Sequence, residues 1–353
     1  MKKSLILASA LLCGQAYAGS ISFDGRFDYS SKSYNDDANE PSHSTFTAKS
    51  MRIDYQGKLN DDVSFRMRAR LDQQDAEKNG KDTLSKAVDF AFISHKMSDY
   101  LTLHLGKFSS EMGGFEGGTP STDLYLNSEA YSGKTSTGTS LVSGTTDYLN
   151  VSGIKAAFKV GDFTLSGMVT DRNKSGNVDP ACTTDCDQIH DTQNTKFLLG
   201  LVAKGNHMEG GLKSNISFYQ EEKDKDTKRT WTAVGLQGKV SDFVLTADYL
   251  MNEYKKAAGT DKVNSIVAHV AYSGIEQWTP ALKVFSSQSE IGANKDNGTG
   301  ISAVLEYKPV SEANFRYHVA YNNHTTKGDS TADKDLTMTE FVAGVRLNAD
   351  FLK

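Results

Sequence analysis

The sequence has little proline and little cysteine, with 5 Pro and 3 Cys among 353 residues. So little proline excludes a collagen-like chain, and 17 Phe and 15 Tyr supply aromatic surface that a disordered chain lacks. Beyond the N-terminus there is no run of about 20 apolar residues, which excludes a membrane-spanning helix. A transmembrane β-barrel is not excluded, because its strands alternate polar and apolar residues and contain no such run.

The first 18 residues have the pattern of a secretory signal peptide. Met1-Lys2-Lys3 is a basic start, residues 5–12 form a short apolar core, and two alanines at positions 16 and 18 precede a cleavage point before Gly19. A lipoprotein anchored at Cys13 is the alternative, and it is disfavoured because Leu12 stands where a small residue is expected. We therefore expect residues 1–18 to be removed and residues 19–353 to form one exported domain.

The exported chain is acidic. The full sequence holds 39 Lys and Arg against 44 Asp and Glu, a net charge of −5, and removal of Lys2 and Lys3 makes this −7. A nucleic-acid partner is therefore not expected. The eight histidines are scattered without the spacing of metal ligands, and no Gly-x-Ser-x-Gly nucleophile motif occurs. The sequence thus predicts no catalytic residue, no metal and no cofactor.

Two cysteines remain after the signal peptide, and they lie close together in a polar stretch. Cys182 and Cys186 are separated by three residues within residues 172–194. Export to an oxidising compartment favours a disulfide between them. The alternative is a metal site, whose further ligands would be Asp179, Asp185, Asp187 and His190.

Alternation of polar and apolar residues predicts sixteen β-strands. The segments are 21–30, 45–58, 62–73, 86–97, 100–107, 146–159, 162–171, 195–205, 210–220, 229–240, 242–254, 262–274, 277–287, 298–308, 312–323 and 337–351. In residues 62–73, for example, Phe65 and Met67 share one face while Arg66 and Arg68 share the other. Such two-faced strands suit either an antiparallel barrel or a soluble sandwich.

The connections between the strands separate these two possibilities. Every second connection is very short, such as Asn60-Asp61, Ser98-Asp99 and Gly161, whereas those in between are long and polar. This asymmetry is typical of outer-membrane barrels, whose tilted strands need about 9–11 residues to cross the bilayer. Aromatic residues near strand ends suit the interfacial girdles of such a barrel: Tyr29, Tyr55, Tyr100, Trp231, Tyr254, Trp278, Tyr307, Tyr321 and Phe351. The predicted fold class is all-β, a transmembrane antiparallel barrel of sixteen strands.

Arginine is concentrated in one part of the predicted wall. Seven of the nine arginines lie on the polar face of the first three and last two strands: Arg26, Arg52, Arg66, Arg68, Arg70, Arg316 and Arg346. Closure of the barrel makes the last strand a neighbour of the first, so these seven share one sector. Four carboxylates on the same face could hold the guanidinium groups apart: Asp24, Asp54, Asp72 and Asp89. The alternative is an ordinary solvated face without a specific role.

The pattern resembles the Gram-negative general porins over residues 19–353. The fifth strand ends Leu105-Gly106-Lys107-Phe108, similar to the family's Gly followed by a basic residue, and the longest connection, residues 109–145, comes next. The resemblance implies that this third loop folds into the lumen and narrows it. Its acidic residues would then face the arginines, with either Glu111 or Glu116 at the centre: Glu111, Glu116, Asp123 and Glu129. The resemblance also implies a homotrimer in the outer membrane, in contact with lipid and lipopolysaccharide.

These features predict a water-filled channel for passive diffusion of ions and small hydrophilic solutes. The arginine sector leaves open a pore selective for phosphate or another anion. We expect few aromatic residues inside the barrel, with Phe285 the main one, which disfavours a sugar pore. An outer-membrane enzyme or an adhesin is the remaining alternative.

Overall fold

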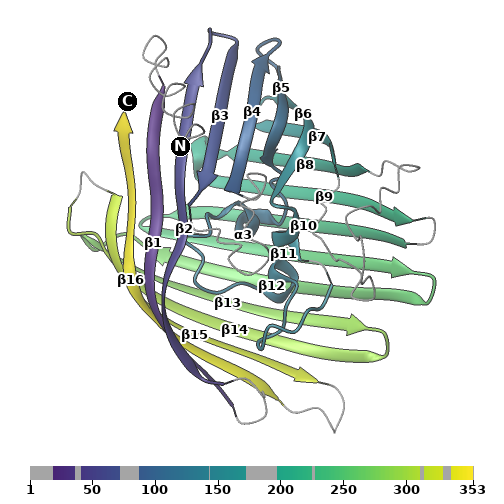
Figure 1. Cartoon of the computed structure of the whole chain (residues 1–353), viewed down its shortest axis with the longest axis vertical. Coiled ribbons are helices and arrows are strands. Elements are labelled where there is room, and N and C mark those ends of the chain that lie inside the picture. Colours follow the sequence, from purple (N-terminus) through teal and green to yellow (C-terminus); the bar gives the residue numbers. More distant parts are fainter. Residues whose placement is uncertain are drawn as a thin grey trace, which may run out of the picture.

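The computed structural model describes residues 19–35, 41–71, 87–142, 144–171, 197–224, 227–310, 314–328 and 335–352. Sixteen strands follow one another along the chain (Figure 1). They are β1 Ser20–Tyr34, β2 His43–Lys58, β3 Val63–Arg70, β4 Val88–Lys96, β5 Leu101–Ser109, β6 Asn150–Val160, β7 Phe163–Asp171, β8 Phe197–His207, β9 Leu212–Asp224, β10 Thr227–Val240, β11 Phe243–Lys256, β12 Gly259–Tyr272, β13 Trp278–Ile291, β14 Asn294–Tyr307, β15 Asn314–Gly328 and β16 Leu336–Leu352.

The strands form one closed antiparallel barrel. Each strand pairs with the next in sequence, and β1 pairs with β16 to close the sheet. Arg26 of β1 and Arg346 of β16 stand directly opposite each other in this closing pair. The predicted fold class and strand number are therefore confirmed.

None of the helices in the described part of the chain is long and apolar enough to span a membrane.

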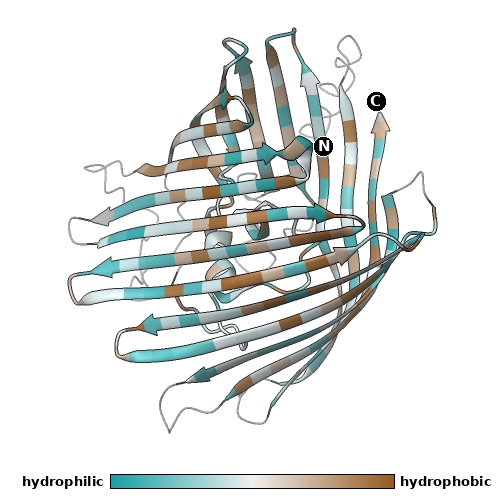
Figure 2. Ribbon diagram, turned by 180° about the vertical axis from the view of Figure 1, so that it is seen from behind, coloured by the Kyte–Doolittle hydropathy of each residue, from teal (hydrophilic) through white to brown (hydrophobic). Residues whose placement is uncertain are grey.

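The barrel is apolar outside and polar inside. Outward side chains such as Ile266 and Leu201, both 63% exposed, form the outer face, whereas inward residues such as Ser265 and Asn322 are buried. Figure 2 shows this alternation along the strands. The two faces predicted for β3 are correct, because Met67 is exposed on the outside and Arg66 and Arg68 line an inner cavity.

Several strand boundaries differ from the predicted ones at the long-loop end. A tight turn at Lys256–Gly259 joins β11 to β12, and another at Ile291–Asn294 joins β13 to β14. The sequence predicted long loops at both places. The polar ends of these strands lack apolar alternation, so the sequence signal stops before the hydrogen-bonded ladder does. The girdle prediction is also wrong at two positions, because Trp231 and Tyr254 belong to inward clusters.

Two β-bulges alter which side chains face the interior. In β2 the pairing with β1 shifts between Asp24↔Arg52 and Arg26↔Lys49, which places the extra residue at Ser50. In β4 the pairing with β3 shifts between Arg68↔Phe90 and Ala69↔Val88. An extra residue in one strand breaks the period of two, so Asp89 and Phe90 both face inward.

Candidate functional site

The segment from residue 110 to residue 149, here called the inner loop, lies inside the barrel. It contains α3 Gly114–Gly118, α4 Glu129–Ser132 and η3 Thr145–Tyr148 (Figure 1). The Asp248 carboxylate of β11 accepts hydrogen bonds from the backbone N–H groups of Phe115 at 2.8 Å and Glu116 at 2.9 Å. Further along, the N–H of Ala130 donates to Ser265 of β12 at 3.0 Å. The inner loop is thus attached to the wall formed by the later strands.

Apolar packing and two glycines make this attachment close. Leu124, Leu126 and Tyr131 of the inner loop pack with inward residues of β10–β13 and β16 in one core cluster. Gly114 has a φ of +65°, and a Cβ atom there would collide with the Asp248 carboxylate. Gly298 of β14 likewise leaves room for the Glu129 carboxylate. Larger residues at either position would push the inner loop into the lumen.

Three of the four predicted acidic residues hold the inner loop instead of facing the arginine-rich wall of β2 and β3. Glu116 accepts hydrogen bonds from the N–H and the hydroxyl of Ser128 and pairs with Lys283 of β13 at 2.7 Å. Glu129 is fully buried and accepts from the Thr326 hydroxyl of β15 at 2.8 Å. Asp123 pairs with Arg316 and Arg346. Asp123 therefore meets two of the seven predicted arginines, whereas Glu116 and Glu129 contact Lys283 and Thr326 and none of those seven.

Of the four predicted acidic residues of the inner loop, Glu111 lines the main cavity. Its carboxylate lies 3.3 Å from Lys155 of β6 and 3.3 Å from Lys204 of β8. Burial alone would raise the pKa of the Glu111 carboxyl, but these two ammonium groups hold it below its usual range. The side chain is therefore ionised at neutral pH.

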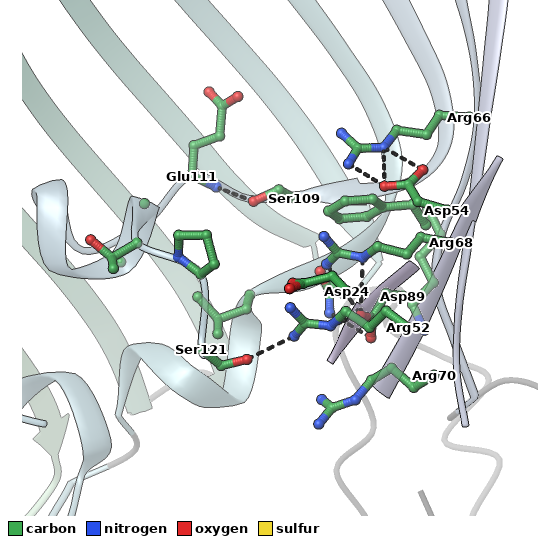
Figure 3. Close-up of a pocket in the computed structure, with 18 of the residues that line it drawn as sticks. Asp24, Arg52, Asp54, Arg66, Arg68, Arg70, Asp89, Ser109, Glu111 and Ser121 are labelled. Atoms are coloured by element: carbon green, nitrogen blue, oxygen red, sulfur yellow. Dashed lines mark hydrogen bonds and ion pairs between the residues drawn. The ribbon is translucent and has the colours of Figure 1, made fainter. Parts of the chain in front are cut away.

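The main cavity lies between the inner loop and the wall formed by β2–β4. Its volume is about 800 Å³, and four arginines project into it from β2 and β3: Arg52, Arg66, Arg68 and Arg70. Arg66, Arg68 and Arg70 alternate along β3, so successive side chains stand about 7 Å apart on one face. Figure 3 shows these guanidinium groups one above another, opposite Ser121 of the inner loop. Arg52 reaches across and donates to the Ser121 hydroxyl at 2.9 Å.

Carboxylates and one aromatic ring fix the arginine side chains. Arg66 Nε donates to both carboxylate oxygens of Asp54 at 3.0 Å. Arg52 and Arg68 both pair with Asp89 at 3.1 Å. The ring of Phe90 stands between Arg66 and Arg68, at 4.7 Å and 3.8 Å from their guanidinium carbons.

Phe90 is a lining residue that the sequence analysis missed. Strict alternation from Asp89 turns residue 90 toward lipid, and only the β4 bulge brings it inside. The expectation of few inward aromatics is also wrong, because a second cluster inside the barrel contains Phe108, Tyr148, Tyr219 and Trp231. Tyr148 belongs to the inner loop, the other three belong to strands that pack with it, and none of the four lines the main cavity.

The remaining three predicted arginines contact the inner loop. Arg26 is 2% exposed, pairs with Asp28 and donates to the carbonyl of Thr122 at 3.0 Å. Arg316 pairs with Glu306 and Asp123 and lines a second cavity. Arg346 contacts Asp24 and Asp123 at the edge of the main cavity. The single predicted sector is thus divided between a lumen-facing group and a group that fixes the inner loop.

The charged side chains that line the main cavity are mostly cationic. Seven are basic: Arg52, Arg66, Arg68, Arg70, Lys107, Lys204 and Arg346. Four are acidic: Asp24, Asp54, Asp89 and Glu111. The net charge of the lining is therefore +3, opposite in sign to that of the whole chain.

Comparison with known proteins identifies the family. A family model described as Gram-negative porin matches residues 4–328. No curated protein matches the sequence. Among solved structures, OmpT of Vibrio cholerae in its trimer form has a TM-score of 0.60 at 14% identity, covering 94% of this chain and 100% of that one. DcaP of Acinetobacter baumannii has a TM-score of 0.60 at 14% identity, covering 95% of this chain and 98% of that one. OmpF of Salmonella typhi has a TM-score of 0.58 at 12% identity, covering 94% of this chain and 97% of that one.

The family match confirms the resemblance drawn from the sequence. It covers most of the chain, and the closed barrel of sixteen strands agrees with it. The chain belongs to the Gram-negative porins, and it is an outer-membrane β-barrel that forms a channel for small solutes.

Proposed function

We propose that this porin conducts small anions in preference to cations, and that Arg52, Arg66, Arg68 and Arg70 set this preference. The observation that carries the proposal is the net charge of +3 on the lining of the main cavity, although the full chain carries −5. Charges more than about 10 Å from a permeating ion are largely screened at 0.1 M salt. The lining of the main cavity therefore outweighs the acidic residues elsewhere on the chain.

The proposal is tested with purified protein in a planar lipid bilayer. We expect stepwise ohmic conductance and, in a KCl gradient, a reversal potential shifted toward the equilibrium potential of chloride. A barrel that carries no current would refute the channel in this chain. A reversal potential on the potassium side would refute the anion preference alone.

A pore selective for one class of anion is the second candidate, and the arrangement of Arg66, Arg68 and Arg70 along one strand favours it. Such a row offers successive sites for phosphate or a carboxylate. One structural neighbour of the same fold, OccK2 of Pseudomonas aeruginosa, is in complex with glucuronate. Saturation of the current at low phosphate or carboxylate concentration, with chloride current unsaturated, would favour selectivity over general diffusion.

An enzymatic or adhesive role is not part of this proposal. The sequence has no Gly-x-Ser-x-Gly nucleophile motif. If the purified protein hydrolysed a phospholipid or a peptide from a test panel, this result would show an enzyme. If the barrel bound cells and passed no ions, this result would indicate an adhesin.

We infer that three copies assemble into a homotrimer in the outer membrane, surrounded by lipid and lipopolysaccharide. The structure of OmpT in its trimer form supports this inference. Outward apolar residues also meet on the closing strands, where Phe27 of β1 stands opposite Val345 of β16. We expect a trimeric mass in mild detergent, and a purely monomeric mass would contradict the inference.

Removal of the signal peptide and a disulfide between Cys182 and Cys186 remain predictions, since both fall outside the described residues. We expect the purified protein to begin at Gly19 and to show no free thiol before reduction. Replacement of both cysteines by serine should leave the melting temperature of the barrel nearly unchanged, because closing so short a loop restricts little chain entropy. Full reaction with a maleimide without reductant would contradict the disulfide.

Replacing Phe90 with leucine should reduce the anion preference without changing any charge. The ring contacts the guanidinium groups on both sides, and each cation–π contact contributes about 0.5–2 kcal/mol. Leucine leaves Arg66 and Arg68 freer to turn away from the lumen. The shift in reversal potential should be smaller than that caused by removing the arginines. Phe65→Leu on the outward face of β3 is the matched control and should behave as wild type.

A further inference from the structure

A row of aliphatic side chains crosses the inner wall of the barrel, from the short-turn end of β11 to the middle of β16. Val244 of β11 stands opposite Ala271 of β12, Ala271 opposite Ala281 of β13, and Ala281 opposite Val304 of β14. The row continues through Ala320 of β15 to Val342 of β16. The interior of a porin is normally polar. A row six strands wide therefore needs an apolar partner.

The inner loop covers this row only in part. Ala320 and Val342 are buried, whereas the other four members are partly exposed in a second cavity of about 320 Å³. Leu124, Tyr125 and Leu126 of the inner loop line the opposite side of this cavity. Among the residues that the structure describes, Thr119 alone lines both this cavity and the main one. The second cavity is thus a separate space between the inner loop and β10–β15.

The second cavity is acidic where the main cavity is basic. Four carboxylates and two cations line it: Glu116, Asp123, Asp248 and Glu306, with Lys283 and Arg316. Glu116 pairs with Lys283 and Glu306 pairs with Arg316, each at 2.7 Å. Asp248 instead accepts two backbone N–H groups, and Lys283 is the nearby cation whose charge acts on it. The lining residues therefore sum to a net charge of −2, and Arg346 at the edge of the main cavity also pairs with Asp123.

The aromatic lining adds a further preference for a cation. Phe115 and Tyr125 of the inner loop both line the second cavity, and the Tyr125 ring already lies 4.4 Å from the guanidinium carbon of Arg26. Aromatic faces attract ammonium groups, most strongly where water is displaced. An aliphatic wall, aromatic rings and an excess of negative charge are complementary to an organic cation with an apolar body.

We propose that the second cavity is a binding site for a small monovalent organic cation with an apolar body, of the aryl-alkyl-ammonium class. The apolar body lies on the row formed by Val244, Ala271, Ala281 and Val304. The ammonium group lies toward Asp248 and the rings of the inner loop. This site is independent of the anion path, and it does not rest on the anion preference proposed above.

Binding is measured by saturation-transfer NMR on the purified full-length barrel in detergent. The probes are benzyltrimethylammonium, benzenesulfonate, which pairs an aryl body with a negative charge, and tetramethylammonium, which has the charge without the body. Only benzyltrimethylammonium should give a saturable signal. Ala281→Phe, which fills the cavity, should weaken its binding at least tenfold. Ala303→Phe is the matched control, because Ala303 lies next to Val304 but faces outward and is exposed.

Each outcome decides the matter. Binding of benzyltrimethylammonium that Ala281→Phe abolishes and Ala303→Phe preserves supports the site. Equal signals from benzenesulfonate, or an Ala281→Phe variant that binds as wild type, overturn it. If Ala281→Phe does not form a folded barrel, Val304→Asn makes the wall polar and must weaken binding in the same way. Conductance and reversal potential of the same preparation separate these results from a failure of the proposed function.

Discussion

Replacing Arg66 and Arg68 together with serine should shift the channel from anion preference toward cation preference. The double replacement lowers the net charge of the main cavity lining from +3 to +1 and leaves the acidic residues Asp54 and Asp89 in place without these partners. Permeating ions pass within a screening length of these groups, so the field at the cavity changes directly. The reversal potential in a KCl gradient should move toward the potassium side, with a larger shift at low salt than at high salt.

Removal of two positive charges elsewhere provides the control for this experiment. Lys58 and Lys239 are exposed near the short-turn end and do not line the main cavity. Their joint replacement with serine removes the same charge and should change the reversal potential much less. If the arginine variant keeps the wild-type potential while neutralisation of Asp224 and Asp226 changes it, selectivity is set at the mouth of the channel.

The sequence predicts the arginine wall because strand parity is a local property. Once the alternation of β3 is recognised, Arg66, Arg68 and Arg70 must share the face opposite Met67. Barrel closure then makes Arg346 a neighbour of Arg26, as the pairing of β1 and β16 shows. This much follows from the period of two and needs no knowledge of how the inner loop is placed.

The sequence could not predict which arginines face the lumen and which fix the inner loop, because this depends on contacts between distant parts of the chain. Arg26 and Arg346 are engaged by Thr122 and Asp123 only because α3 and α4 attach the inner loop to the later strands. The position of Phe90 depends on a bulge of one residue. Nothing in the alternation of β4 reports that extra residue, since Phe90 is a good strand residue on either face.

The two glutamates of the inner loop should have different effects when they are replaced. Glu116 joins Ser128 of the inner loop to Lys283 of the wall, and Lys283 also donates to the carbonyl of Leu126. Glu116→Ala leaves Lys283 without its carboxylate in a buried position, which costs about 3–5 kcal/mol in comparable sites. The inner loop should loosen, and single-channel recordings should show a noisy open state with frequent transitions between current levels.

Glu111→Gln is the matched comparison, because Glu111 lines the main cavity and forms no part of the Glu116 contacts. This replacement should leave the current quiet and raise the anion preference, since it removes one negative charge from the lining. The melting temperature of the barrel should fall in Glu116→Ala and change little in Glu111→Gln, because only the first replacement leaves a buried cation without its carboxylate. A quiet Glu116→Ala channel beside a noisy Glu111→Gln channel would reverse the two assignments.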